Sequence, residues 1–155
     1  MAASEYRQAL EIRDAFARYQ LRYLFIGKSG TILLGFPDTT QDADIFVEKI
    51  PVNCEGLVHA LGDLGFQMSE REAAEVRRGK AFIQLKNGPF DLNLIFAPDG
   101  IERFEEAWNR RVDVEGFPVC SIDDILASKK AANRSKDIES LPRLLSFRDW
   151  LKSRR

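Results

Sequence analysis

Two short segments of this chain alternate acidic residues with apolar ones. In residues 42–47, strand alternation directs Asp42 and Asp44 to one face and the apolar side chains to the other. In residues 90–96 the same alternation places Asp91 on the face opposite four apolar side chains. A strand with one apolar face must pack that face on a core. The pattern therefore predicts a sheet in the middle of the chain, with carboxylates on its second face.

The carboxylates have two interpretations. Asp42 and Asp44 stand side by side if residues 42–47 are a strand, and such a pair repels itself unless water or a cation screens it. Magnesium with oxygen ligands is the usual partner. If the strand containing Asp91 is a neighbour, three carboxylates converge, one of them free to take a proton. The alternative is an ordinary strand start that faces solvent.

The rest of the chain predicts alternating helices and strands. Apolar spacing indicates an amphipathic helix over residues 4–20. In the rest of the chain, Gly and Pro residues mark the turns between the expected elements. Strands are expected at 22–26, 43–47, 81–85 and 90–96, the last two joined through Asn87-Gly88, and a hairpin at 111–120. Helices are expected at 31–34, 55–64, 101–108 and from 121 to the end, with a break or a helix start at Pro142. Residues 69–78 are ambiguous. The fold class is α/β, or α+β, with a mixed sheet flanked by helices.

The length and composition favour one intact domain over residues 1–155. A chain of 155 residues with 45% hydrophobic content can build one core. No apolar run is long enough to cross a bilayer and the first residues are polar, so we expect a cytoplasmic protein without a membrane partner. Cys54 and Cys120 lack disulfide or zinc spacing and are expected to be small apolar residues. His59 is expected to be structural or at the surface, and the tryptophans and phenylalanines to be core.

The C-terminal segment, about residues 121–155, is expected to be helical and basic. Residues 129–155 contain nine Lys and Arg against three Asp and Glu, although the net charge of the whole chain is −1. A basic segment beside an acidic body would meet phosphates or RNA. A solvated basic helix, with Arg134 paired to Asp137, explains the same residues.

The turn Gly27-Lys28-Ser29-Gly30 lies between a predicted strand and a predicted helix. Backbone N–H groups and the helix dipole favour an anion at such a position. Ser29 adds a hydroxyl donor and Lys28 a positive charge. The P-loop motif is excluded, because it requires a glycine where this chain has Arg22. A tight turn without a ligand is the alternative.

Taken together, the segments from Phe25 to Ser29 and from Gly35 to Ile45 resemble the nucleotidyltransferase superfamily related to DNA polymerase beta. That family has a Gly and Gly or Ser pair after an apolar residue, then an acid pair within a strand, and a third acid on a later strand. Residues 121–137 are similar to the tail of small bacterial members akin to abortive-infection and toxin–antitoxin nucleotidyltransferases. Two residues depart from the pattern: Lys28 replaces the second small residue, and Asp38 stands where relatives often have a basic residue.

The resemblance implies functional roles for these residues. Asp42, Asp44 and Asp91 would hold two Mg²⁺ ions, or Mn²⁺, and Asp91 would assist deprotonation of the acceptor hydroxyl. The nucleoside triphosphate would contact Gly27, Lys28 and Ser29 together with Lys129 or Lys130. The activity would be transfer of a nucleoside monophosphate to a hydroxyl of RNA, a protein or a small molecule, with release of pyrophosphate.

Two other functions compete with transfer. One is a non-catalytic module that binds a nucleotide or a partner, such as one half of a toxin–antitoxin pair with its cognate partner. Lys28 favours this non-catalytic module. The other is a metal-dependent phosphodiesterase, for which the usual additional histidines are missing. Three repelling carboxylates favour the transferase, because a protein that only binds a partner has no need to hold them together.

Overall fold

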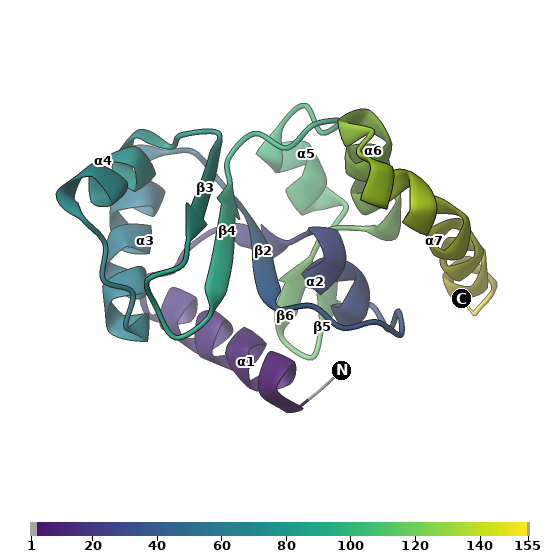
Figure 1. The fold of residues 1–155 in the computed structure, drawn as a ribbon, viewed down its shortest axis with the longest axis horizontal. Helices are drawn as coiled ribbons and strands as arrows, with labels where there is room; N and C mark the ends of the chain where they lie inside the picture. The colour runs from purple at the N-terminus through teal and green to yellow at the C-terminus, as the bar shows by residue number, and fades with distance from the viewer. Residues whose placement is uncertain (1–2, 155) are drawn as a thin grey trace.

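The structure is a computed structural model that describes residues 3–154. Within this range the chain forms seven helices and six strands (Figure 1). The helices are α1 (Ala3–Arg18), α2 (Gly27–Leu33), α3 (Pro51–Leu64), α4 (Glu70–Arg78), α5 (Phe104–Asn109), α6 (Ile122–Ala132) and α7 (Ser135–Ser153). The strands are β1 (Tyr23–Phe25), β2 (Asp42–Val47), β3 (Phe82–Leu85), β4 (Asp91–Ile95), β5 (Val112–Val114) and β6 (Phe117–Val119).

The described strands form one mixed sheet in the order β3-β4-β2-β1-β6-β5. The central strand β2 runs parallel to β4 and antiparallel to β1. The two antiparallel hairpins, β3 with β4 and β5 with β6, form the two edges of the sheet. This arrangement confirms the predicted fold class, a mixed sheet with flanking helices and a helical C-terminus.

One face of the sheet carries the main core. Ala43, Ile45 and Val47 of β2 point to this face and are buried among apolar residues of α1 and α3. Leu92 and Leu94 extend the same buried surface on β4. This is the alternation that the sequence predicts.

The second face of the sheet is covered only in part. Phe46 packs edge to face on Phe104 of α5, with the ring centroids 5.0 Å apart, and Leu24 is buried beside residues of α5 and α6. Helix α6 packs on α2 and α7. Helices α6 and α7 lie at the opposite end of the molecule from α3 and α4 (Figure 1). The uncovered part of this face contains the two aspartates of β2.

Several element boundaries differ from the predictions. Residues 70–78 are helical, since Ser69 caps α4 with a capping box that includes Glu72. Helix α7 runs through Pro142, so the predicted break or helix start there is wrong. The chain breaks earlier, at Asn133, whose backbone is left-handed (φ 51°) and ends α6.

Most of the predicted core residues are buried or partly buried, but two aromatic residues are exposed. Cys54 and Cys120 are buried free thiols, as predicted. The side chains of Trp150 (48% exposed) and Phe82 (51% exposed) lie at the surface, so the expectation of a core position is wrong for both. Helical or strand spacing identifies a face of an element, but it does not show whether another element covers that face.

None of the described helices combines the length and the apolar character that a membrane span requires.

Candidate active site

Asp42 and Asp44 lie on the uncovered face of the sheet, next to β4. The parallel register pairs Asp42 with Asp91 and Asp44 with Asn93, so all four side chains belong to the same face. Asp42, Asp44 and Asn93 line a cleft of about 810 Å³. Among the described side chains, Asp91 is not part of the cleft lining; it is partly buried beside Asp42. Adjacent strands therefore bring the three predicted acids together as neighbours, but only two of them face the cleft.

Asn93 is a site residue that the sequence analysis missed. Its Nδ2 donates a hydrogen bond to Asp44 Oδ1 at 2.9 Å and approaches Asp42 Oδ2 at 3.5 Å. Its Oδ1 is buried and has no partner within the described chain. The sequence contained a sign of this position, because Asn93 is two residues after Asp91 in the same strand and therefore points to the same face of the sheet. The amide holds the two carboxylates without adding a third negative charge.

The electrostatic surroundings favour a cation beside the two aspartates. Burial raises the pKa of Asp44, the hydrogen bond from Asn93 opposes that rise, and the negative charge of Asp42 adds to it. The positive charges of Lys129 and Lys136 act in the opposite direction, lowering the pKa. Because a raised carboxyl pKa means that the ionised form is disfavoured, a bound cation would restore the ionised pair.

Gly27 allows the chain to pass close to Asp44. Its backbone is left-handed (φ 61°), and a Cβ at this position would lie 2.7 Å from Asp44 Oδ2. The predicted turn at 27–30 is the first turn of α2 itself, not a loop before the helix. The glycine is required both for its backbone conformation and for the space beside the carboxylate.

The Gly27→Ala variant is expected to be destabilised by at least about 1–2 kcal/mol, the cost of the left-handed conformation for an L-residue. Urea unfolding measures the loss. The control is Gly62→Ala in α3, where an added Cβ meets nothing within 4 Å. That variant is expected to gain about 0.5–1 kcal/mol, because alanine is favoured over glycine inside a helix. Equal unfolding free energies for the two variants would contradict this account of Gly27.

Ser29 fixes α2 to β2. Its hydroxyl donates to the carbonyl of Ile26 at 3.1 Å and accepts the backbone N–H of Asp44 at 3.0 Å. The residue is 4% exposed. These bonds within the protein position the backbone at Asp44, whereas contact between the hydroxyl and a triphosphate remains a prediction.

The two residues that depart from the family pattern form an ion pair with each other. Lys28 Nζ lies 3.7 Å from Asp38 Oδ2, and both side chains line the cleft. A lysine at the position of a small residue is thus accompanied by an acid at a position where relatives often have a base. The pair adds no net charge to this edge of the cleft.

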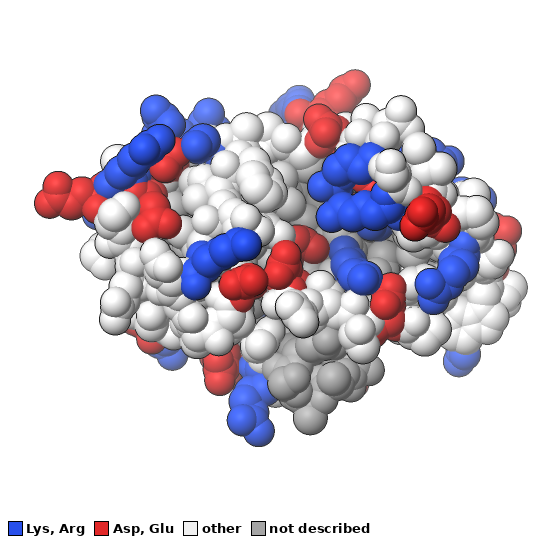
Figure 2. All heavy atoms as spheres, viewed as in Figure 1, with Lys and Arg blue, Asp and Glu red and all other residues white. Residues whose placement is uncertain are grey.

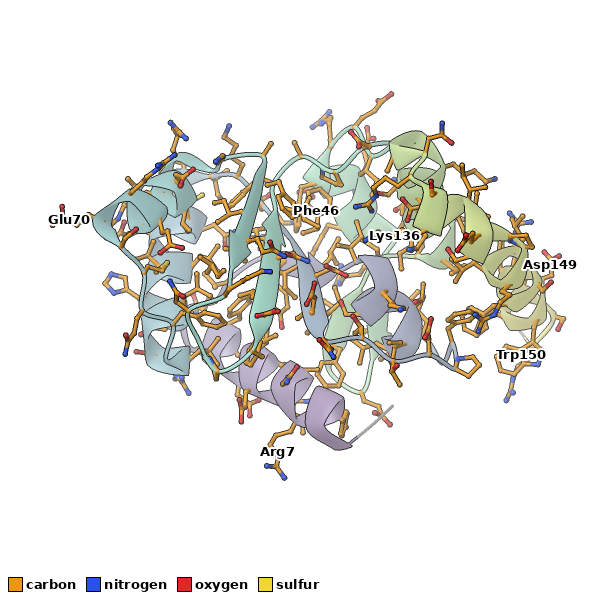
Figure 3. All side chains as sticks on the ribbon, viewed as in Figure 1. Arg7, Phe46, Glu70, Lys136, Asp149 and Trp150 are labelled. Atoms are coloured by element: carbon orange, nitrogen blue, oxygen red, sulfur yellow. The ribbon has the colours of Figure 1, made fainter. Side chains whose placement is uncertain are left out.

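Positive side chains from the C-terminal helices line the side of the cleft opposite β4. In Figure 2, Lys and Arg side chains gather beside a central group of Asp and Glu side chains. The residues concerned are Lys129, Arg134, Lys136 and Arg143, and the acids Asp137 and Glu139 line the cleft among them. Lys136 lies on the side of these helices that faces the sheet (Figure 3).

Asp137 organises part of this positive wall. It is 1% exposed, and its carboxylate lies 2.8 Å from Arg134 Nε and 3.6 Å from Lys129 Nζ. Burial acts to raise the pKa of Asp137, but the hydrogen bond from Arg134 and the two positive charges outweigh it and hold the pKa below its ordinary value. The Arg134–Asp137 pair, expected as an alternative to phosphate binding, is confirmed.

The other predicted phosphate contacts differ in position. Lys129 and Lys28 line the cleft, whereas Lys130 is exposed and, among the described residues, lies outside the cleft lining. Lys136 and Arg143 line the cleft although the sequence analysis did not select them. Their positions depend on how α7 folds back on α6 after Asn133, which helical spacing along one element does not reveal.

The residues present fit a magnesium ion whose other ligands come from water or a bound phosphate group. Among the described side chains, no three Asp, Glu, His or Cys residues gather closely enough to hold a metal ion by themselves. Magnesium is commonly held by one or two carboxylates together with substrate phosphates and water. Asp42 and Asp44 supply that number of carboxylates at one end of the cleft.

Comparison with known proteins identifies the fold. No family model matches the sequence, and a search of curated proteins finds no match. Two solved structures are similar over nearly the whole chain. The lincosamide antibiotic adenylyltransferase LnuA, bound to lincomycin, has a TM-score of 0.62 and 16% identity over 94% of this chain and 98% of its own. A candidate nucleotidyltransferase from Thermotoga maritima has a TM-score of 0.54 and 16% identity over 99% of this chain and 96% of its own. The chain therefore has the fold of the nucleotidyltransferase superfamily.

Proposed function

We propose that this chain, with its nucleotidyltransferase fold, transfers a nucleoside monophosphate from a nucleoside triphosphate to an acceptor hydroxyl and releases pyrophosphate. The observation that carries the proposal is the charge arrangement of the cleft. A carboxylate pair, Asp42 and Asp44, faces a wall of lysine and arginine side chains across one space. This is the arrangement needed to hold a metal-bound triphosphate, with its phosphates on the positive wall and its reacting phosphorus beside the carboxylates.

The chain's own residues position the reacting groups. Gly27 leaves room beside Asp44, Asn93 holds the carboxylate pair, and Lys136 offers a cation to the phosphates. Magnesium, when bound by Asp42 and Asp44, would supply positive charge to the reacting phosphate and orient it, with a second ion expected from the resemblance.

The reaction balances as a displacement at the α-phosphorus. The acceptor oxygen forms a bond to that phosphorus, while the bond from the phosphorus to the oxygen bridging the α- and β-phosphates breaks. The electron pair leaves with pyrophosphate. The acceptor proton passes to a carboxylate. We propose Asp91, which stands next to Asp42 on the same face of the sheet but outside the cleft lining, so that the proton would reach it by way of a water molecule.

The direct test is incubation with each labelled nucleoside triphosphate, magnesium and separate pools of RNA, protein and small alcohols. Transfer of label names the nucleotide and the acceptor class together. A small-molecule pool is included because LnuA, which shares this fold, is a lincosamide antibiotic adenylyltransferase. Triphosphate binding without transfer to any pool would contradict the transferase and favour a nucleotide-binding module.

The second candidate, a module that binds nucleotide without transferring it, is favoured by one observation. The residue of β4 that lines the cleft beside Asp44 is the neutral Asn93. Among the described residues, no third acid lies close enough to Asp42 and Asp44 to share a metal ion with them. Pyrophosphate release separates the two functions, because a binding module produces none.

Lys136→Ala is expected to weaken triphosphate binding about tenfold, which corresponds to the loss of about 1.4 kcal/mol from one charge-assisted contact. The matched control is Lys130→Ala, which removes the same charge from the neighbouring helix α6 outside the cleft lining. Calorimetric titration with a nucleoside triphosphate and magnesium measures both dissociation constants. Equal losses for the two variants would show a general effect of charge instead of a contact in the cleft.

A further inference from the structure

Phe82 presents an exposed aromatic ring on the cleft side of the sheet. It lies on the edge strand β3 and lines the cleft together with Gln84 of the same strand. With 51% of its surface exposed, Phe82 is among the most exposed large apolar residues of the described chain. The main core lies on the opposite face of the sheet, so packing within the described chain does not account for this ring.

The strand register arranges the cleft face in rows. Phe82 pairs with Ile95 of β4, which in turn pairs with Phe46 of β2. In the next row Gln84 pairs with Asn93, which pairs with Asp44. An apolar row, whose outer members Phe82 and Ile95 are accessible, therefore lies beside a polar row that ends at the carboxylates.

Charge divides the two sides of the cleft. Within the described chain, the lysine and arginine residues that line it come from α2, from α6, from α7 and from Arg134 between the last two helices, and they outnumber the acids Asp38, Asp137 and Glu139 on the same side. The lining residues on the β3 side are Phe82, Gln84 and Ile95, which carry no charge. A polyphosphate is attracted to the helical side and gains nothing comparable on the strand side.

In-line displacement requires the acceptor and the leaving pyrophosphate to occupy opposite sides of the reacting phosphorus. The attacking and leaving oxygens lie on roughly opposite sides of the phosphorus. If pyrophosphate leaves toward the positive wall and the phosphorus sits beside Asp42 and Asp44, the acceptor must approach from the β3 side. This step rests on the proposed function.

We infer that Phe82 and Gln84 form the acceptor subsite, and that the acceptor is a neutral small molecule with a hydroxyl group next to an apolar ring. The ring stacks on Phe82, and Gln84 offers both a hydrogen-bond donor and an acceptor to the polar part of the molecule. The residues that line the β3 side of the cleft offer no charge partner to a polyanion such as RNA.

The test compares Phe82→Ala with Phe82→Tyr in the intact protein. The probes are phenyl β-D-glucoside, 2-phenylethanol and adenosine as ring-bearing neutral alcohols, methyl β-D-glucoside as the alcohol without an aromatic ring, and pools of RNA and protein. Label is expected on a ring-bearing alcohol and not on methyl glucoside. Phe82→Ala is expected to raise the KM for that alcohol about tenfold or more, as loss of an aromatic stacking partner does. Phe82→Tyr, which retains the ring, is expected to restore the KM.

The controls separate this inference from the proposed function. The dissociation constant for the triphosphate is expected to be unchanged in Phe82→Ala. Trp150→Ala, which removes an equally exposed aromatic residue from the far end of α7 (Figure 3), is expected to change neither constant. Label on RNA or protein alone, or an unchanged KM in Phe82→Ala, overturns the acceptor subsite and leaves the transferase standing. Triphosphate binding without label on any probe overturns the transferase, and the subsite with it.

Discussion

Asp44→Asn is expected to reduce nucleotidyl transfer at least about a thousandfold, because charge stabilisation by a metal ion supplies several kcal/mol and each 1.4 kcal/mol is tenfold in rate. Asparagine keeps the shape of the side chain but removes the charge that would hold the ion. The initial rate of labelled product formation with saturating magnesium measures the loss. The control is Asp99→Asn, which removes an exposed acid outside the cleft lining. A rate within tenfold of the unmodified protein would remove Asp44 from the metal site.

The same variant is expected to change the pH dependence of stability. Burial raises the pKa of Asp44 in the folded chain above its value in the unfolded chain. The folded protein therefore binds more protons than the unfolded one as the pH rises above about 4, so the contribution of Asp44 to stability falls with increasing pH. Without metal, Asp44→Asn should melt at or above the temperature of the unmodified protein at pH 7, and the difference should shrink toward pH 4. A lower melting temperature at pH 7 would contradict the raised pKa.

Asp91→Asn is expected to reduce transfer by a factor of about 10²–10⁴, the usual contribution of a general base. Asparagine removes the proton acceptor while keeping its shape. The melting temperature is expected to be unchanged or higher, because Asp91 has no hydrogen bond or ion pair within the described chain and lies beside the like charge of Asp42. Transfer kinetics and thermal unfolding are measured on the same preparation.

Two outcomes would revise this assignment. If Asp91→Asn melts markedly lower, Asp91 is a structural acid and its kinetic effect is indirect. If the variant keeps full activity with a verified magnesium requirement, the proton acceptor is another group. Asp99→Asn again controls for the loss of one negative charge, since it leaves the sheet unaltered.

The register between β2 and β4 was predictable only in part. Alternation within each strand correctly separated the acids from the core residues. It did not show that Asp44 pairs with Asn93 while Asp91 pairs with Asp42, because register depends on contacts between strands far apart in sequence. The register between β2 and β4 therefore decides that an amide, and not a third carboxylate, lies beside Asp44 on the face of the sheet that lines the cleft.

The departures at Lys28 and Asp38 show the same limit. Considered separately, each residue weakens the resemblance to nucleotidyltransferases. In the folded chain they form one ion pair at the edge of the cleft. The nine positions between them are the rest of α2 and the loop that follows it, so their contact depends on how that loop returns toward the helix.

The sequence by itself determined the periodic features: an amphipathic first helix, strands with one apolar face, acids on the other face, and a basic helical C-terminus. These follow from local geometry, since side chains repeat every two residues in a strand and every 3.6 in a helix. Only the tertiary structure decided which faces are covered. Burial of Phe46 under α5, exposure of Phe82, and convergence of Lys129, Lys136 and Arg143 on the cleft all depend on packing between distant elements. The physical reason is that an apolar or charged face has the same local pattern whether another element packs on it or solvent does.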